Sequence, residues 1–293
     1  MHLRAALIRT SLNGTARVAP RLAGRWALSL FSHPMTRVAV RPAEEPVMRR
    51  ADRGELVVNG KTAVVYRWGA GTRPVLLMHG WLSRASRFSP LIQALTERGY
   101  SPVAFDAPGH GDAGGRGTTI LEYRDMARQL HAEHGRFAAV IGHSVGGMGA
   151  FFALRDEIGA DRLITIGAPA EFGYLVDSFR ATAGLGRWAG PELRRRIESD
   201  VFPGEHDIWA RFSATYRPGQ LTMPILVIHD ESDDMVTIEQ CRRVKAAHDG
   251  RADLLITRGL GHRRILAAPE VIEAVLDFVS ATEPAARTPD SRP

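Results

Sequence analysis

Short apolar runs alternate with longer segments that carry apolar residues at helical spacing, and this alternation constrains the fold of the 293-residue chain most. Each run has four or five residues, which suits a strand that is buried on both faces. The runs are 75–78, 102–105, 137–141, 162–166, 224–228 and 252–256. The helical segments are 88–98, 120–133, 146–155, 236–247 and 269–279. Strands and helices in this order predict an α/β fold, with a mostly parallel sheet covered by helices on both faces.

Two segments interrupt the alternation. Residues 56–58 and 62–66 are short β-prone runs joined by Asn59-Gly60, the dipeptide favoured in two-residue hairpin loops, so we expect an antiparallel hairpin there. Residues 170–222 are rich in aromatic side chains but contain no clear strand, and we interpret them as a helical insertion. Residues 55–280 are therefore predicted to form one domain that carries this insertion.

The positive charge of the chain, +6 overall, is concentrated before residue 55. Residues 1–54 contain ten arginines and three acidic residues, whereas the other 239 residues contain 28 basic and 29 acidic residues. The main domain therefore lacks the basic face that nucleic-acid binding requires, and we expect no nucleic-acid partner.

Residues 1–54 are predicted to be a basic arm and linker. Four apolar residues of the arm recur at helical spacing: Leu22, Trp26, Leu30 and Phe31. They could pack on the main domain. Alternatively, the mixture of arginine and apolar residues could make weak contact with an anionic membrane surface, and disorder is a third alternative. Proline and paired charges indicate a linker at 37–53. Because the charge of the arm lies outside the predicted domain, removing residues 1–40 is expected to affect stability or location before chemistry.

The sequence gives no sign of export or of a membrane span. No stretch reaches the ~18–20 apolar residues of a spanning helix, and arginines interrupt the first 30 residues, where a signal peptide needs an apolar block. Cys241 is the only cysteine, which excludes an internal disulfide and a cysteine-based zinc site. We expect a cytoplasmic protein, with a disordered tail at 281–293.

The sharpest local motif is Gly-His-Ser-Val-Gly-Gly at 142–147, between an apolar run and a helical segment. A serine on such a tight strand-to-helix turn adopts strained backbone angles, and the flanking glycines allow the close approach of neighbouring chain. The turn places the Ser144 hydroxyl at the N-terminus of a helix, where free N–H groups face developing negative charge. This motif is a nucleophile candidate.

Partners for this serine follow along the chain. A serine hydroxyl is a poor nucleophile at pH 7, so it needs an imidazole to take its proton and a carboxylate to orient that imidazole. His262 follows one of the later strands, and the loop acids at 230–234 follow the strand before it. Ser144, one of these acids and His262 therefore stand in the order that a nucleophile elbow requires.

Motifs at four separate places resemble those of the α/β-hydrolase superfamily, over about residues 55–280. They are His-Gly-Trp at 79–81, Asp-Ala-Pro-Gly-His-Gly at 106–111, the elbow at Ser144, and the loop 229–236 followed by 261–262. The resemblance implies an eight-stranded, mostly parallel sheet flanked by helices. It also implies that the insertion at about 170–222 is a lid over the site.

The resemblance assigns roles residue by residue. Asp233 matches the triad acid, with Asp230 and Asp234 as rivals. The oxyanion hole would be formed by the backbone N–H groups of Trp81 and Val145. Three histidines in the motif loops are expected to be structural hydrogen-bonding groups: His79, His110 and His143. No spacing matches a zinc, calcium or nucleotide site, so no metal or cofactor is expected.

These features predict a serine hydrolase that cleaves small to medium, rather apolar carboxylic esters through an acyl-enzyme, with a small-molecule ester as its substrate. Other chemistries of the same fold stay open: thioesterase, lactonase, amidase, carbon–carbon bond hydrolase and cofactor-free perhydrolase. A non-catalytic binding protein of this fold and a peripheral membrane lipase are the remaining alternatives. The oligomeric state and the natural substrate do not follow from the sequence.

Overall fold

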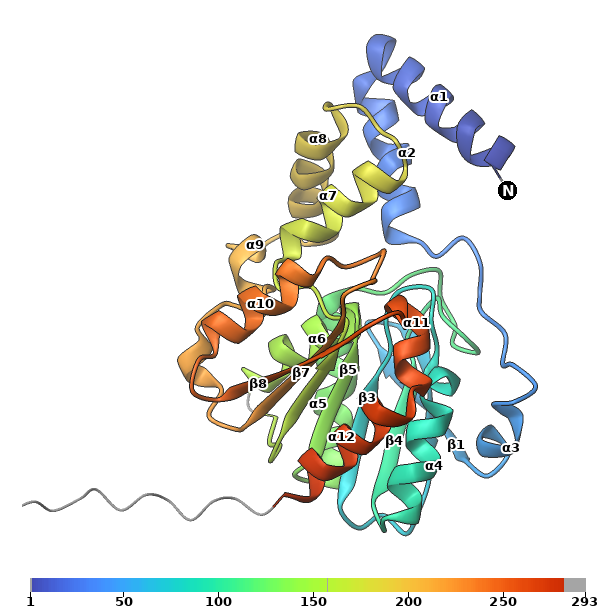
Figure 1. Ribbon diagram of the computed structural model, residues 1–293. Helices are drawn as coiled ribbons and strands as arrows, with labels where there is room; N and C mark the ends of the chain where they lie inside the picture. The colour runs from blue at the N-terminus through green and yellow to red at the C-terminus, as the bar shows by residue number, and fades with distance from the viewer. Residues whose placement is uncertain (1, 157, 282–293) are drawn as a thin grey trace, which may run out of the picture.

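The computed structural model describes residues 2–156 and 158–281. Eight strands form one sheet in the order β1-β2-β4-β3-β5-β6-β7-β8 (Figure 1). The strands are β1 (Asp52–Val58), β2 (Lys61–Arg67), β3 (Pro74–Met78), β4 (Ser101–Asp106), β5 (Ala139–His143), β6 (Leu163–Ile166), β7 (Ile225–Asp230) and β8 (Ala252–Thr257). β1 and β2 pair antiparallel, β2 joins β4 antiparallel, and all other pairs are parallel. The predicted eight-stranded, mostly parallel sheet is confirmed.

The predicted hairpin joins β1 to β2. Val58 pairs with Lys61, so the loop consists of Asn59 and Gly60 alone. Their φ angles are 49° and 71°, and two successive positive values are the geometry for which Asn-Gly is selected.

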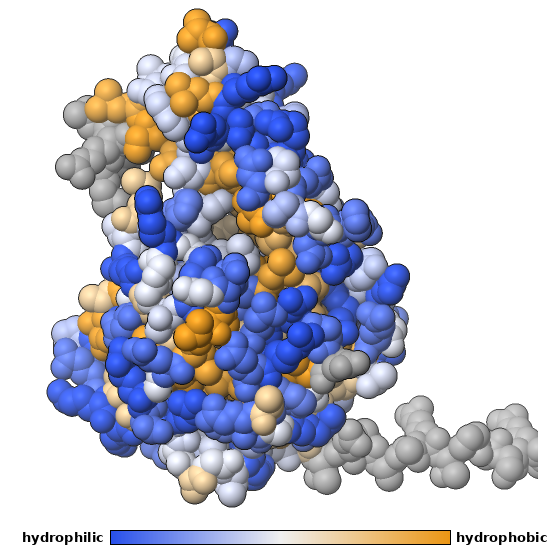
Figure 2. All heavy atoms as spheres, turned by 180° about the vertical axis from the view of Figure 1, so that it is seen from behind, coloured by the Kyte–Doolittle hydropathy of each residue, from blue (hydrophilic) through white to orange (hydrophobic). Residues whose placement is uncertain are grey.

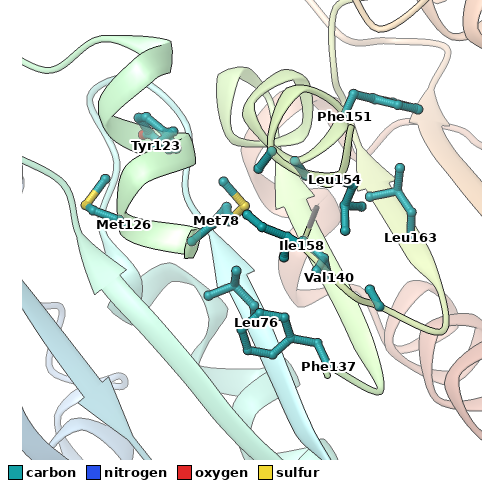
Figure 3. Close-up of a cluster of buried hydrophobic side chains, with 14 of the residues drawn as sticks. Leu76, Met78, Tyr123, Met126, Phe137, Val140, Phe151, Leu154, Ile158 and Leu163 are labelled. Atoms are coloured by element: carbon teal, nitrogen blue, oxygen red, sulfur yellow. The ribbon is translucent and has the colours of Figure 1, made fainter. Parts of the chain in front are cut away.

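Helices cover both faces of the sheet because the central strands are buried on both sides. Along β3, Leu76 and Met78 enter one core cluster, whereas Val75 and Leu77 enter the other. The first cluster is covered by α5 (Ile120–His134), α6 (Val145–Leu154) and α10 (Ile238–Ala247), and Figure 3 shows part of it. The second is covered by α4 (Ser89–Glu97) and α12 (Pro269–Ser280).

The insertion is helical, as predicted, and it does not stand alone. Its elements are α7 (Phe172–Thr182), α8 (Ala189–Arg196), a π-helix (Ile197–Val201), α9 (Ile208–Arg211) and a 3-10 turn (Pro218–Gln220). The arm forms α1 (His2–Val18) and α2 (Pro20–Ser32), and Figure 1 shows α2 beside α7 and α8. A third core cluster contains Leu12 and Ala27 of the arm together with Phe172 and Leu193 of the insertion.

The arm docks through a face that differs from the predicted one. Leu22 and Trp26 are 42% and 46% exposed, whereas Ala23, Gly24 and Ala27 are buried. Small residues face α8 because the helices approach closely, and a Cβ on Gly24 would collide with Glu192 and Arg196 of α8. Leu30 and Phe31, the other two residues of the predicted face, are partly buried against the third cluster.

The predicted linker at 37–53 is packed against the domain. It contains α3 (Glu45–Met48) and the start of β1. Arg37 donates hydrogen bonds to the carbonyl groups of Gly111, Ala113 and Gly115, and the buried Glu44 carboxylate accepts from Ser86 and pairs with Arg87. Proline and paired charges here mark an ordered irregular segment. The predicted tail lies outside the described residues from 282 onward.

Candidate active site

Ser144 lies on a strained turn between β5 and α6. Its φ and ψ are 54° and −126°, a region that residues with a side chain rarely adopt. The glycines of the motif are required by close packing: a Cβ on Gly146 would overlap the carbonyl oxygen of Met78, and one on Gly142 would overlap the Cα of Gly147. The serine is only 9% exposed and lines a cavity, and the close packing around its turn leaves the backbone no room to relax.

Asp233 and His262 meet at the carboxyl ends of β7 and β8. His262 Nδ1 lies 2.7 Å from Asp233 Oδ2, and Asp233 Oδ1 accepts from the backbone N–H groups of Met235 and Val236 at 2.8 Å each. Burial raises the pKa of Asp233, but these hydrogen bonds outweigh it, so its pKa lies below the ordinary value. The carboxylate therefore stays ionised beside the imidazole at neutral pH.

Ser144 and His262 line the same cavity. Within residues 2–156 and 158–281, the Ser144 hydroxyl makes no hydrogen bond to His262. Catalytic hydrogen bonds are often long in structures without substrate and tighten when substrate binds. Gly167, at φ 58°, follows β6 beside the pair, where a Cβ would lie 3.3 Å from both Asp233 Oδ2 and His262 Nδ1.

Asp230 has a different position from Asp233. Its buried carboxylate accepts hydrogen bonds from the backbone N–H groups of Ser232, Leu260 and Gly261 and from the Thr257 hydroxyl. These contacts join the end of β7 to the loop that carries His262. The other rival, Asp234, is exposed. Of the three acids, the structure brings Asp233 to the imidazole.

A buried histidine supports the loop that carries Trp81. His79 Nε2 accepts from the N–H of Ala107, and its Nδ1 donates to the carbonyl of Gly80 at 2.7 Å. Burial lowers the pKa of His79 to about 4, so the ring is neutral at pH 7 and can accept and donate at once. The Tyr123 hydroxyl adds a hydrogen bond to the His79 carbonyl.

His143 contacts His262, the candidate catalytic histidine. Its Nε2 donates to the carbonyl of His262 at 2.8 Å, and the two rings lie 4.8 Å apart. Burial lowers the pKa of His143 to about 3, and that of His110, which contacts the Trp81 indole, to about 3. All three histidines expected to be structural thus make structural contacts around the site.

Two backbone N–H groups are free beside the serine. The backbone of Gly80 lies so close to Ser144 that a Cβ on Gly80 would be 2.7 Å from the Cβ of Ser144. Trp81 follows Gly80, and Val145 is the first residue of α6. Among the described residues, neither the Trp81 N–H nor the Val145 N–H donates a hydrogen bond, and both residues line the cavity.

The cavity has a volume of about 2070 Å³ and is closed on one side by the arm. Its walls include Leu28 and Phe31 of α2 together with Phe172 and Phe179 of α7. The N-terminal arm therefore does not lie apart from the site, and removing residues 1–40 would open the cavity that contains Ser144. The prediction that this truncation affects stability or location before chemistry stays a prediction, and assay of the truncated chain on a short soluble ester tests it.

Within the described part of the chain, no group of three or more His, Cys, Asp or Glu side chains is placed to hold a metal ion. No helix among these residues is long and apolar enough to cross a bilayer.

Comparison with known proteins agrees with the fold. The sequence matches the profile of the alpha/beta hydrolase family over residues 75–275, more than half of the chain. The chain belongs to this family. A non-heme haloperoxidase of Rhodococcus erythropolis is 34% identical to this hydrolase-fold chain, over 75% of the chain and 97% of the haloperoxidase. A human serine hydrolase-like protein is 35% identical, but the match covers 33% of this chain and only half of that protein.

Solved structures share the fold at low sequence identity. An esterase of Pyrococcus furiosus superposes with a TM-score of 0.63 at 19% identity, covering 85% of this alpha/beta hydrolase and 97% of the esterase. A thioesterase domain from the curacin biosynthetic pathway gives 0.57 at 16% identity, covering 79% and 99%. Family and fold together support a hydrolase, and the bond that it cleaves has to be argued from the site itself.

Sequence reasoning missed two contributors to the site. The sequence predicted Asp230 only as a rival catalytic acid, although its carboxylate accepts four hydrogen bonds that hold the loop carrying His262. The arm is expected to pack on the domain, contact a membrane surface or be disordered, and none of these alternatives places α2 on the wall of the cavity. Its charge composition gave no signal for this, because contact with α7 and α8 depends on residues about 150 positions away.

Proposed function

We propose that this alpha/beta hydrolase is a serine esterase that cleaves carboxylic esters through Ser144, His262 and Asp233. The observation that carries the proposal is the 2.7 Å pair of His262 and Asp233, on the same cavity as a serine held at φ 54°. A strained serine on the same cavity as an oriented imidazole is the arrangement that makes a hydroxyl nucleophilic at neutral pH.

Each residue has a defined role in the reaction. Ser144 Oγ attacks the ester carbonyl carbon while His262 Nε2 takes its proton, and the pair with Asp233 stabilises the resulting imidazolium. When the tetrahedral intermediate collapses, the C–O bond to the alcohol breaks and His262 gives the proton to the departing alkoxide. Water then attacks the acyl carbon while His262 takes its proton. When this second intermediate collapses, the bond to Ser144 Oγ breaks, His262 returns the proton to Ser144, and the carboxylic acid leaves.

The negative charge of both tetrahedral intermediates would be stabilised by the free N–H groups of Trp81 and Val145. His79 contributes indirectly, because its two hydrogen bonds fix the backbone that presents Trp81. Donors that are already fixed need no reorganisation during the reaction, and one such donor typically contributes about 3–4 kcal/mol.

The cavity favours an apolar acyl chain at the upper end of the predicted size range. Its volume of about 2070 Å³ exceeds the ~300–1,000 Å³ of ordinary small-ligand sites, and aromatic side chains of α7 stand on its wall. In this proposal the insertion and the arm form a lid over the acyl chain.

A fluorophosphonate label tests the nucleophile. We expect one covalent adduct at Ser144, loss of hydrolysis of p-nitrophenyl esters, and a kcat about 10⁶-fold lower in Ser144→Ala. Ser199→Ala, which removes an exposed hydroxyl of the insertion, is the matched control and should keep both label and turnover. An adduct on another residue, or substantial turnover by Ser144→Ala, would show that the mechanism is wrong.

A perhydrolase is the second candidate, favoured by the similarity to a non-heme haloperoxidase over nearly its whole length. Hydrogen peroxide would replace water in deacylation, so that the acyl-enzyme gives a peracid and the free serine. Bromination of monochlorodimedone in acetate buffer with peroxide and bromide tests this. Bromination that is abolished by Ser144→Ala supports perhydrolysis, and its absence while esters are hydrolysed excludes it.

A further inference from the structure

The two faces of α2 differ sharply in what they contact. One face, with Ala23, Gly24 and Ala27, is buried against the insertion. The other presents Leu22 and Trp26, 42% and 46% exposed, and Figure 2 shows apolar atoms gathered at this end of the molecule. A helix that is already docked on one side normally presents polar residues on the other, so this exposed apolar pair is unexplained by folding.

Arginines accompany the exposed apolar residues. Arg17, Arg21 and Arg25 are exposed, and within the described residues none of them forms an ion pair. Residues 1–43 contain no acidic residue, so no intramolecular partner is available nearby in sequence. By contrast, Arg195 of α8 is paired with Glu192. The arm thus has an uncompensated positive charge beside an apolar surface.

We propose that this arm, α1 with α2, docks the protein on an anionic lipid surface. Trp and Leu side chains enter the boundary between headgroups and acyl chains, while arginines bind the headgroup phosphates, so a face that alternates the two fits a bilayer. Val18 extends the apolar part at 86% exposure. The negatively charged cytoplasmic leaflet carries the required charge.

Charge complementarity favours lipid over a second copy of the chain. A two-fold dimer through the exposed face would bring Arg21 and Arg25 against the same residues of the other copy. Like charges at such an interface repel, and residues 1–43 offer no carboxylate to compensate them. An anionic surface meets the arginines and the apolar residues together.

The docked arm would connect the membrane to the site. Leu28 and Phe31 on α2 line the cavity, whereas Leu22 and Trp26 of the same helix face outward. If Ser144 cleaves esters, as proposed above, lipid-dissolved esters would reach it along this helix. Docking itself does not depend on that chemistry, so a binding assay tests it separately.

Co-sedimentation of the full chain with vesicles tests the proposal. We expect binding to phosphatidylcholine vesicles that contain phosphatidylglycerol, weaker binding as salt rises, and little binding to pure phosphatidylcholine. Arg17→Gln with Arg21→Gln should weaken binding about thirtyfold, since each arginine near an anionic surface contributes ~1 kcal/mol. The matched control, Arg242→Gln with Arg243→Gln on α10, removes the same charge from another surface and should change binding less than about twofold.

The apolar part has its own test. Trp26→Ser with Leu22→Ser should weaken binding at least tenfold, and the vesicle-induced fluorescence shift of the parent protein should disappear. Unchanged thermal unfolding and unchanged hydrolysis of a short soluble ester would show that the variants fold. Three outcomes would overturn the proposal. The parent protein could bind neutral vesicles as well as anionic ones, or the α10 control could lose as much binding as the arm variants. An arm variant could also dissociate a dimer without affecting vesicle binding.

Discussion

Replacing Asp233 by asparagine tests how the structure orients His262. Asp233 Oδ1 accepts two backbone N–H bonds from Met235 and Val236, at 2.8 Å each, so the oxygen of the asparagine will stay there. Its NH₂ group then faces His262 Nδ1, where the carboxylate stood at 2.7 Å. Because NH₂ needs an acceptor, the imidazole must place its proton on Nε2, and it can no longer take the proton of Ser144.

The expected loss follows from this wrong tautomer. We expect kcat to fall about 10⁴-fold, a barrier increase of about 5.4 kcal/mol. KM should change little, because the cavity that binds the acyl chain is intact. Steady-state hydrolysis of a p-nitrophenyl ester over pH 6–9 measures both parameters, and circular dichroism establishes that the variant is folded.

Asp234→Asn is the control, since Asp234 is exposed and one residue away. Its kcat should stay within about threefold of the parent enzyme. The reasoning is refuted if Asp233→Asn keeps a kcat within tenfold of the parent, or if Asp234→Asn loses more than Asp233→Asn does.

Three further outcomes are expected. Gly146→Ala should lower the free energy of unfolding by about 2 kcal/mol or more in urea titrations, because its Cβ overlaps a carbonyl of β3, whereas Gly219→Ala, with open space, should not. Asn13→Ala removes three hydrogen bonds to the 184–188 loop and should lower the free energy of unfolding by about 2–3 kcal/mol. It should also slow the hydrolysis of long-chain esters more than the hydrolysis of acetate esters. The pKa values of His143 and His110 are lowered to about 3 in the fold and that of His79 to about 4, so the unfolded chain binds these protons first as pH falls below 6.5. Stability should therefore decrease by up to about 1.4 kcal/mol per pH unit for each of these histidines, measured by urea unfolding at pH 7 and 5.5.

The sheet and the site candidates could be predicted because their signals are local. Each central strand is buried on both faces, so it is a continuous apolar run that ends where its loop begins. The elbow likewise needs small residues at fixed offsets, and the structure shows the collisions that those glycines avoid. The choice of Asp233 among the loop acids came from the resemblance, and the hydrogen bond to His262 agrees with it.

The arm could not be placed from its own sequence. Helical spacing selected Leu22 and Trp26 as the buried side, but contact with α8 required small residues, and Gly24 and Ala27 are buried instead. Which side of a helix is buried depends on the shape of its partner as well as on hydropathy. The partner here is a segment about 150 residues further along, whose position is set by the sheet.

The shared core of the arm and the insertion also has a consequence for biosynthesis. The arm leaves the ribosome first, but α8, which covers Ala23 and Ala27, is translated about 160 residues later. At ~5–20 residues per second this delay is roughly ten to thirty seconds. During that time the nascent chain exposes an apolar, arginine-rich helical segment with no partner, which is the composition that chaperones and anionic surfaces capture. Translation speed between codons 33 and 196 should therefore influence how much of this protein reaches its folded state.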